Sequence, residues 1–363
     1  MRVFAVPVIL AALCVCLSAV PAPAKKKPPK TFFFVHDGGD HGSPNQVFVY
    51  EVAKKGKLRV VPGSPFVSAN TEDATSGDCN TVAYAAGRKM LFAGGGNGIS
   101  AWNVGRGGAL SELSGSPFGG FEATGIAVVE RDGATFVYAS ETNEGRLRGY
   151  QVGVDGTLTP LATPTFAAPN EPYGMAVVGA RLFVTNASVL GGGPLVFDVL
   201  ADGALQAIPG SPVGTARSLV IYAARGRPAV YLPDCPVGNV VGFSAAGAAV
   251  SPTPGSPYAS GVYACNTLAI GGARAVALPY GSTAQVFRIN TDLSLTPLLG
   301  AQPTGLANPA ACAIAPNDAC LIVADYGATT VRSFRFLKDG GLKKVGDLAL
   351  PAADVTGSVI GQQ

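Results

Sequence analysis

The chain has 363 residues, of which 48% are hydrophobic and 13% charged, so it can bury a large core and does not have the composition of a disordered protein. Its formal charge is +3, with no basic run beyond the N-terminus, which argues against the clustered Lys and Arg that nucleic-acid binding requires. The 48 Gly and 28 Pro fall at regular intervals, a pattern that indicates many turns rather than low complexity.

The N-terminus predicts export. Arg2 precedes an uncharged apolar run from Val3 to Val20, and Ala22-Pro23-Ala24 is a small-x-small cleavage site. A membrane anchor is the alternative, because the run is about 18 residues long. The short positive flank and the cleavage-like end favour a signal peptide over residues 1–24. We therefore expect a secreted or periplasmic protein with a basic, proline-containing leader at 25–30, one domain at 31–363 and no later membrane span.

One motif, Gly-Ser-Pro followed by an aromatic or apolar residue, recurs about every 45 to 52 residues, the spacing of a repeat architecture. Intact copies occupy residues 63–66, 115–118, 210–213 and 255–258. Altered copies stand at 162–165 and 301–304, and residues 345–348 occupy the seventh position without the proline. The chain therefore consists of seven units.

Each unit contains four short strand patterns. In the third unit these are residues 125–129, 135–139, 146–152 and 157–161, with a hairpin turn at Asp155-Gly156. Small residues dominate the first strands, as expected where strands converge on a propeller axis. A third-strand aromatic recurs in every unit and is predicted to pack between neighbouring blades: Tyr50, Trp102, Tyr150, Phe197, Phe243, Phe287 and Phe334.

The first unit lacks a first strand, because the mature chain starts with a second-strand pattern at Thr31–Val35. The missing pattern appears at the other end of the chain, at Thr356–Ile360. Joining the two ends in one blade closes the ring and removes open sheet edges. The sequence thus predicts an all-β, seven-bladed β-propeller of four-stranded antiparallel blades, closed by a C-terminal strand that completes the first blade.

These units resemble the seven-bladed lactonase-like propellers, which include 6-phosphogluconolactonase and the carboxymuconate-cyclising enzymes and are close to the YVTN-repeat surface proteins. The resemblance covers nearly all of the mature chain and implies a ligand site near the central channel. It identifies architecture better than activity. The sequence departs from the catalytic members in having no His-Pro-His stretch, and its only histidines are His36 and His41.

A lactonase mechanism needs an activated water and a group that stabilises the oxyanion. The segments that lead into the first strands supply Glu122, Glu171 and Arg217, which are the candidate catalytic residues. A carboxylate would activate the water, and Arg217 would stabilise the oxyanion. A structural arginine that pairs with a neighbouring loop carboxylate is the alternative role for Arg217.

Further candidates for ligand binding lie on the same predicted face. The loop after Val35 gathers His36, Asp37, Asp40 and His41, which are possible metal ligands on a glycine-rich loop, although such loops also form ordinary turns. Glu141 and Tyr173 belong to other loops of this face, where a solvated loop is the alternative. No cofactor is predicted, and the question of a metal stays open.

Five cysteines remain after the predicted cleavage, so at least one is unpaired within the chain. We expect a disulfide between Cys235 and Cys265, which lie in loops of one face in successive units. Cys312 and Cys320 flank one hairpin and are expected to be simple buried residues. Asn186-Ala187-Ser188 is a glycosylation sequon that has meaning only in a host that glycosylates.

Two functions follow from these observations. The first is a binding or scaffold protein, a monomer that recognises a small molecule, a carbohydrate or an envelope protein, and not nucleic acid. The second is a hydrolase of a sugar lactone or a related small cyclic ester. The absent histidine motif and the predicted export favour the first.

Overall fold

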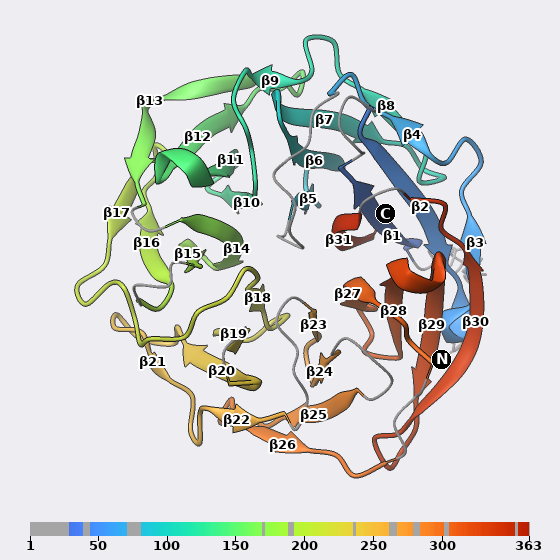
Figure 1. Ribbon diagram of the computed structural model, residues 1–363. Coiled ribbons are helices and arrows are strands. Elements are labelled where there is room, and N and C mark those ends of the chain that lie inside the picture. The colour runs from blue at the N-terminus through green and yellow to red at the C-terminus, as the bar shows by residue number, and fades with distance from the viewer. Residues whose placement is uncertain are drawn as a thin grey trace, which may run out of the picture.

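The computed structural model is a ring of seven β-sheets around a central axis, which confirms the predicted propeller (Figure 1). It describes residues 29–38, 44–70, 81–168, 171–187, 192–234, 237–260, 267–278, 284–300, 305–352 and 355–362. The predicted signal peptide lies outside these ranges. Within them, the structure contains no helix with the length and apolar character needed to cross a bilayer.

We number the blades by their order in the sequence, and each contains four strands in antiparallel order. Blade 1 is β31 (Val355–Gln362), β1 (Thr31–Asp37), β2 (Gln46–Val52) and β3 (Leu58–Val60), with β4 (Phe66–Val67) beside β2. Blade 2 is β5 (Val82–Ala85), β6 (Met90–Gly95), β7 (Gly98–Val104) and β8 (Leu110–Glu112), with β9 (Phe118–Gly119) beside β7. Blade 3 is β10 (Ile126–Arg131), β11 (Ala134–Glu141), β12 (Arg146–Val152) and β13 (Leu158–Ala167).

The remaining blades follow the same plan. Blade 4 is β14 (Pro172–Val178), β15 (Arg181–Asn186), β16 (Leu195–Val199) and β17 (Leu205–Ala207). Blade 5 is β18 (Tyr222–Ala223), β19 (Ala229–Asp234), β20 (Asn239–Ser244) and β21 (Ser251–Pro252), with β22 (Tyr258–Ala259) beside β20. Blade 6 is β23 (Leu268–Ile270), β24 (Arg274–Ala277), β25 (Gln285–Ile289) and β26 (Leu295–Pro297), and blade 7 is β27 (Pro309–Ile314), β28 (Cys320–Asp325), β29 (Thr330–Phe336) and β30 (Leu342–Ala349).

The ring closes as the sequence predicts. The C-terminal strand β31 pairs antiparallel with β1 along its whole length, from Thr31 opposite Gln362 to Asp37 opposite Val355. The first and last described strands therefore lie side by side in one blade (Figure 1). Strand β31 thus covers the edge of β1 that faces the axis and supplies the first strand that unit one lacks.

The core consists of seven apolar layers, one between each pair of neighbouring blades among the described residues. Each layer contains one of the third-strand aromatics. Trp102, for example, packs with Phe32 and Phe34 between blades 1 and 2, and Phe287 packs with Tyr231 between blades 5 and 6. The prediction that these aromatics join neighbouring blades is confirmed.

The Gly-Ser-Pro motif has a specific task in the outer part of the blade. In the four intact copies the glycine has a positive φ, between +80° and +89°, and the Ser-Pro bond is cis. The serine side chain accepts a hydrogen bond from a third-strand N–H, as in Ser64 to Val49 (2.9 Å) and Ser211 to Val196 (2.9 Å). The serine thus supplies a hydrogen-bond acceptor for a third-strand N–H group that has no partner in the interrupted outer strand. In the altered third copy, β13 runs uninterrupted through Ala162–Thr165 instead.

Antiparallel order places the connections on two faces. The second-to-third-strand and blade-to-blade connections form the loop face, which carries the short helices η2 (Thr142–Glu144) and η3 (Tyr326–Ala328). The hairpins between first and second strands and between third and fourth strands form the turn face, which carries η1 (Lys54–Gly56). Figure 1 looks onto the loop face.

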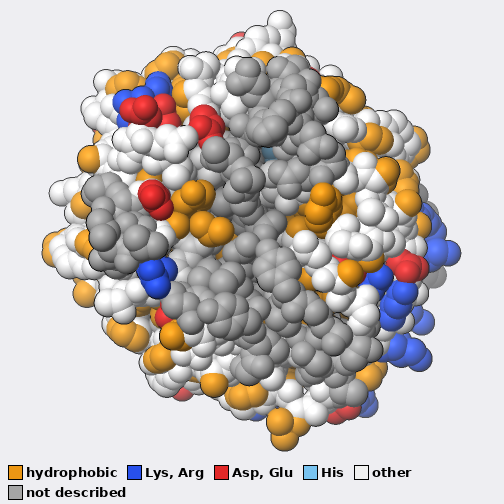
Figure 2. All heavy atoms as spheres, viewed as in Figure 1, with side chains coloured by type: hydrophobic (Ala, Val, Ile, Leu, Met, Phe, Trp, Pro, Cys, Tyr) orange, Lys and Arg blue, Asp and Glu red, His pale blue; other side chains and the backbone are white. Residues whose placement is uncertain are grey.

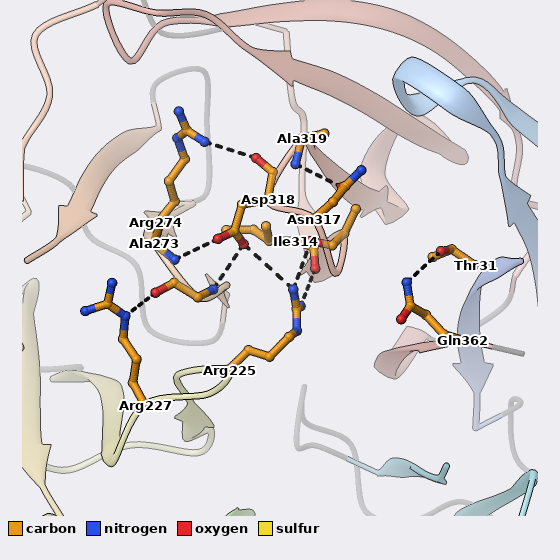
Figure 3. A network of polar contacts seen from close by, with 12 residues as sticks. Thr31, Arg225, Arg227, Ala273, Arg274, Ile314, Asn317, Asp318, Ala319 and Gln362 are labelled. Carbon is orange, nitrogen blue, oxygen red and sulfur yellow. Dashed lines mark hydrogen bonds and ion pairs between the residues drawn. The ribbon is translucent and has the colours of Figure 1, made fainter. Parts of the chain in front are cut away.

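On the turn face, polar contacts join the first hairpins of neighbouring blades (Figure 3). The Asp318 carboxylate of blade 7 accepts hydrogen bonds from the backbone N–H groups of Gly272 (3.0 Å) and Ala273 (2.7 Å) of blade 6. Glu130 of blade 3 does the same for Gly87 of blade 2 (2.9 Å). These carboxylates fix one blade to the next where the strands themselves make no ladder.

Candidate binding site

The segments that lead into the inner strands of blades 3, 4 and 5 lie side by side on the loop face. Ser140 Oγ accepts from the Gly125 N–H (2.7 Å) and donates to the Tyr173 carbonyl (2.9 Å), which links blades 3 and 4. The Gly174 N–H donates to the Leu219 carbonyl (2.9 Å), which links blades 4 and 5. Glu122, Glu171 and Arg217 are each two or three residues ahead of these contacts, so the three predicted residues occupy neighbouring lead-in segments.

The three side chains differ in their surroundings. Glu122 is half-buried and accepts a hydrogen bond from the Asn143 side-chain amide (2.9 Å) in η2. The Glu171 side chain is exposed, and its backbone has a left-handed φ of +60°, a conformation that costs a non-glycine residue about 1 to 2 kcal/mol. Arg217 is half-buried and makes no hydrogen bond or ion pair with any described residue. The alternative structural pairing for Arg217 is therefore not found in this part of the chain.

A cavity of about 340 Å³ lies in the central channel. Residues from five inner strands, β5, β10, β14, β18 and β31, line it, and most are small or apolar. Tyr84 and Tyr222 add phenol rings, and Ser358 adds a hydroxyl. The small inner-strand residues in the sequence thus leave room along the axis. The cavity offers mainly apolar walls, so charged contacts to a ligand must come from the lead-in segments above it.

Glu141 is committed to an internal ion-pair cluster. Its buried carboxylate accepts from Nε of Arg146 (2.6 Å) and of Arg148 (2.8 Å), and both guanidinium groups add a second hydrogen bond. Burial alone would raise the pKa of Glu141, but the hydrogen bonds from the two arginines outweigh it and lower that pKa to about 2. Arg148 also lies over the Phe121 ring at 4.5 Å. Glu141 therefore anchors β12 to β11, and contact with a ligand stays a prediction.

His36 and Asp37 are the last two residues of strand β1, and the prediction that they begin a flexible loop is wrong. Both are buried, His36 with 1% and Asp37 with 0% of its surface exposed. His36 Nδ1 is hydrogen-bonded to the hydroxyls of Thr356 (2.7 Å) and Thr81 (3.1 Å), so it joins the closing strand to blade 2. Burial lowers the pKa of His36 to about 4. The strand extends this far because β31 and β2 both pair with it to its end.

Tyr173 is half-buried in β14, and its carbonyl is the acceptor that links blade 4 to Ser140. Asp40, His41, Cys235 and Cys265 lie outside the described residues, so the loop ligands and the disulfide stay predictions.

Cys312 and Cys320 are buried free thiols, as expected, and burial raises the pKa of Cys320 to about 11. Neither is a thiolate at neutral pH.

Sequence reasoning missed the shared position at the end of the second strands. It holds Asp37, Glu141, Asn186, Asp234 and Asp325 in five blades, and an alignment of the second strands would have shown it. Asp325 accepts from the backbone N–H groups of Ala307 (3.0 Å) and Asn308 (2.8 Å) and lies 3.4 Å from Arg332. In blade 7 this residue therefore holds the lead-in segment in place. Asn186 is 2% exposed, which makes the sequon asparagine inaccessible in the folded protein.

Asn143, which donates a hydrogen bond to Glu122, was also missed, although it lies two residues after the predicted Glu141. Figure 2 shows acidic and basic side chains on the part of the loop face formed by blades 3 to 5, with a group of both signs over β12. Within the described ranges there is no group of three or more His, Cys, Asp or Glu side chains that could hold a metal ion.

Comparison with solved structures identifies the same architecture. A putative 6-phosphogluconolactonase from Bacteroides uniformis matches with a TM-score of 0.69 and 16% identity, over 92% of this chain and 100% of that chain. One from Bacteroides fragilis matches with a TM-score of 0.66 and 16% identity, over 93% and 99%. The periplasmic gluconolactonase of Pseudomonas aeruginosa matches with a TM-score of 0.61 and 15% identity, over 92% and 99%.

No family model matches the sequence, and no curated protein matches it either. The chain thus has the fold of the lactonase-like propellers, as the repeat motif suggested. At this level of identity the likeness extends to the fold alone, because one fold supports many functions. The function has to be argued from the residues of this chain.

Proposed function

We propose that this protein is an exported binding protein whose ligand site lies on the loop face, where blades 3, 4 and 5 meet above the channel. The ligand is a small polar molecule with an anionic group, such as a sugar acid. Arg217 binds that group, and Glu122 and Asn143 supply hydrogen-bonding partners for the rest of the ligand. The observation that carries this proposal is the half-buried Arg217, which has no hydrogen bond or ion pair within the described residues.

The physical argument starts from the environment of that guanidinium. A guanidinium that has lost part of its hydration gains most from a partner that is itself charged, and it presents a planar fork that matches a carboxylate. Such charge-assisted hydrogen bonds contribute about 1.5 to 3 kcal/mol each. The other arginines of this face, Arg146, Arg148 and Arg332, already have carboxylate partners. Arg217 is thus the best candidate among the described residues for an anion from solution.

The test is calorimetric titration with gluconate and related sugar acids and with their lactones. Arg217→Gln should weaken binding about tenfold or more, the loss of one charge-assisted hydrogen bond. Arg288→Gln, which removes an exposed arginine of blade 6, is the matched control and should leave the affinity unchanged. Equal affinities of wild type and Arg217→Gln for every ligand that binds would contradict the proposed role of Arg217.

A lactone hydrolase is the second candidate, and the exposed carboxylate of Glu171 beside the Arg217 segment favours it. In this mechanism Glu171 takes a proton from a water molecule, which attacks the lactone carbonyl. Arg217 stabilises the oxyanion, the ring C–O bond breaks, and Glu171 returns its proton to the leaving ring oxygen, which gives the hydroxy acid. The likeness to the Pseudomonas aeruginosa gluconolactonase supports the reaction class by analogy only.

Acid release from gluconolactone above the uncatalysed rate distinguishes the two candidates. For a hydrolase, Glu171→Gln and Arg217→Gln should each lower kcat/KM by at least about a hundredfold. Glu144→Gln, a change at an exposed carboxylate of the same face, should leave it unchanged. Binding of sugar acids without turnover of any lactone would leave the binding protein as the function.

Export rests on residues 1–24, which have the pattern of a signal peptide. N-terminal sequencing of the protein recovered from the periplasm or the medium should give Lys25 as the first residue. Recovery of a full-length chain that begins at Met1 in the cytoplasm would contradict export.

A further inference from the structure

The structure gathers nearly all described lysines at one place on the ring. Of the eight lysines in the described ranges, seven lie on blades 1 and 7, and only Lys89 lies elsewhere. With two arginines they form what we call the seam patch: Lys30, Lys54, Lys55, Lys57, Arg59, Arg335, Lys338, Lys343 and Lys344. We propose that the seam patch is a docking surface for an anionic lipid bilayer.

The two halves of the patch meet because the ring closes there. Lys57 and Arg59 flank Leu58 in and beside β3, and Lys343 and Lys344 belong to β30. These two outer strands lie side by side across the junction of blades 1 and 7 (Figure 1). Figure 2 shows the resulting row of basic side chains along the edge of the ring over β3 and β30.

The patch carries a large uncompensated charge. Only three acidic residues of the described ranges lie within it, and two of them are paired, Glu51 with Lys30 (3.2 Å) and Asp347 with Lys344 (2.6 Å). Asp339, the third, accepts a hydrogen bond from the Gly341 N–H (2.9 Å). The other seven basic residues of the patch are exposed and have no hydrogen bond or ion pair to a described residue. These seven charges repel one another and make no polar contact within the described ranges that stabilises the fold. We therefore infer that they bind a partner outside the chain.

The chemistry of the patch favours lipid over a small anion. Lysine is a strongly hydrated point charge on a flexible stem, suited to a diffuse negative surface, whereas arginine is the usual choice where a single carboxylate or phosphate is held in a fixed geometry. Two exposed valines interrupt the charges, Val60 (51% exposed) in β3 and Val345 (40% exposed) in β30. Basic side chains around shallow apolar ones are typical of protein surfaces that lie on an anionic bilayer.

A hollow adjoins the patch at the same junction. It has a volume of about 530 Å³, and its polar lining consists of Lys54 and Lys55 from η1, the ion pair of Lys30 with Glu51, Thr31, Asn317 from the first hairpin of blade 7 and Gln362 near the C-terminus. The ammonium and amide groups of this lining can donate hydrogen bonds to the oxygen atoms of a phosphoglycerol headgroup. The hollow gives the bilayer surface one place where a headgroup is held more closely.

Docking through this surface leaves the candidate binding site open. Lys54, Lys55 and Lys338 lie in the third-to-fourth-strand turns, on the turn face, whereas Arg217 lies on the opposite loop face. A protein held by the turn-face edge of blades 1 and 7 therefore presents its ligand site away from the bilayer. The docking surface does not depend on the proposed ligand, and its test is independent of Arg217.

The test is co-sedimentation of the purified protein with two kinds of vesicle, phosphatidylcholine alone and phosphatidylcholine mixed with an equal part of phosphatidylglycerol. Wild type should sediment with the mixed vesicles only, and less as the salt concentration rises. The variant Lys57→Gln/Arg59→Gln/Lys343→Gln should bind the mixed vesicles roughly a hundredfold more weakly, about fivefold for each charge. All three side chains are exposed, and thermal melting checks that the variant is folded.

The matched control is Lys89→Gln/Arg106→Gln/Arg288→Gln, which removes the same charge from exposed positions outside the patch. It should bind like wild type. A second variant, Val60→Ser/Val345→Ser, should weaken vesicle binding several-fold and leave binding to dissolved alginate unchanged. The proposal is overturned if wild type binds both vesicles equally, or if the patch and control variants lose equal affinity. It is also overturned if alginate binds with the same dependence on the patch charges while the valine variant binds vesicles like wild type, because the partner is then an acidic polymer.

Discussion

Arg225 and Asp318 lie in blades 5 and 7, which are not neighbours, yet Arg225 Nη1 approaches Asp318 Oδ1 to 3.7 Å beneath blade 6 (Figure 3). The same guanidinium donates to the carbonyls of Ile314 (2.8 Å) and Ala315 (3.0 Å), at the end of the inner strand of blade 7. The Arg225 N–H also bonds the Gly271 carbonyl of blade 6 (3.2 Å). One residue therefore joins three successive blades at the turn-face end of the channel, its backbone to blade 6 and its side chain to blade 7.

The first prediction concerns the order of importance within this link. Asp318→Asn replaces a carboxylate oxygen with an amide that faces a backbone N–H of blade 6, and should lower the free energy of unfolding by about 2 kcal/mol. Arg225→Gln should cost about 1 kcal/mol, because the Arg225 side chain is 36% exposed and solvent screens its 3.7 Å ion pair with Asp318. Urea unfolding of the two variants measures both losses. A larger loss for Arg225→Gln would show that the guanidinium, and not the backbone clamp, holds the blades.

The second prediction concerns Glu141. Glu141→Gln removes the negative charge between Arg146 and Arg148 and replaces one of the two acceptor oxygens with an NH2 group that faces the guanidinium groups. The free energy of unfolding should therefore fall by about 3 kcal/mol. Glu144→Gln is the control, since Glu144 is exposed and lies 4.0 Å from Arg146, and it should change stability by less than about 0.5 kcal/mol.

The depressed pKa of Glu141 also fixes the direction of a pH effect. The folded protein holds the carboxylate at a pKa of about 2, against 4.5 when unfolded, so the stabilisation is complete above pH 4.5 and is lost as the pH falls toward 2. Unfolding measured over this range should show a shallower acid dependence in Glu141→Gln than in wild type. Identical acid profiles would mean that the carboxylate is not held by the two arginines in solution.

The third prediction concerns His36, whose pKa of about 4 lies below its ordinary value of 6.5 because it is buried. Between pH 6.5 and 4 His36 is protonated in the unfolded chain but neutral in the folded chain. The free energy of unfolding is therefore highest above pH 6.5 and falls as the pH drops from 6.5 to 4. The full effect is about 3 kcal/mol. His36→Gln keeps a hydrogen-bonding group for Thr356 but cannot ionise, and should flatten the profile between pH 4.5 and 7 in urea unfolding. A variant as pH-sensitive as wild type would place the responsible group elsewhere.

The fourth prediction uses a glycine next to the candidate site. A Cβ on Gly125 would lie 2.2 Å from the Tyr173 carbonyl oxygen and 2.9 Å from Ser140 Oγ, so the backbone leading into blade 4 would have to move. Gly125→Ala should lower the free energy of unfolding by about 1 to 3 kcal/mol and should also weaken ligand binding, since Glu122 lies three residues before Gly125 on the same lead-in segment. At Gly346 nothing lies within 4 Å of a Cβ, and Gly346→Ala should be neutral. Equal stability of the two variants would contradict the tight contact.

The fold followed from the sequence because each blade is a local unit. Strand alternation, hairpin turns and the third-strand aromatic recur within about 50 residues, and the unpaired second-strand pattern at Thr31 required a partner that only Thr356–Ile360 could supply. The sequence did not show why the Gly-Ser-Pro motif recurs. That Ser64 or Ser211 accepts a bond from the third strand depends on how the outer strand breaks off, and no pattern of residue types records this.

The site was predictable only in outline. The sequence placed Glu122, Glu171 and Arg217 on the lead-in segments, and the structure puts those segments side by side. The sequence could not show that Glu141 is held by two arginines while Arg217 has no described partner, because in the sequence both are charged residues near loops. His36 and Asp37 were misread as loop residues, since the added pairing with β31 extends the strand from outside its local sequence.

The sequence by itself determined the number of blades, the identity of the closing strand and the residues that pack between blades, because these depend on short-range patterns that repeat. Only the tertiary structure decided which charges are neighbours. One half of the seam patch comes from residues 30–59 and the other from residues 335–344, and neither segment contains enough basic residues in a row to indicate a patch. Ring closure brings the two halves together, and electrostatic potential depends on distance in space and not on separation along the sequence.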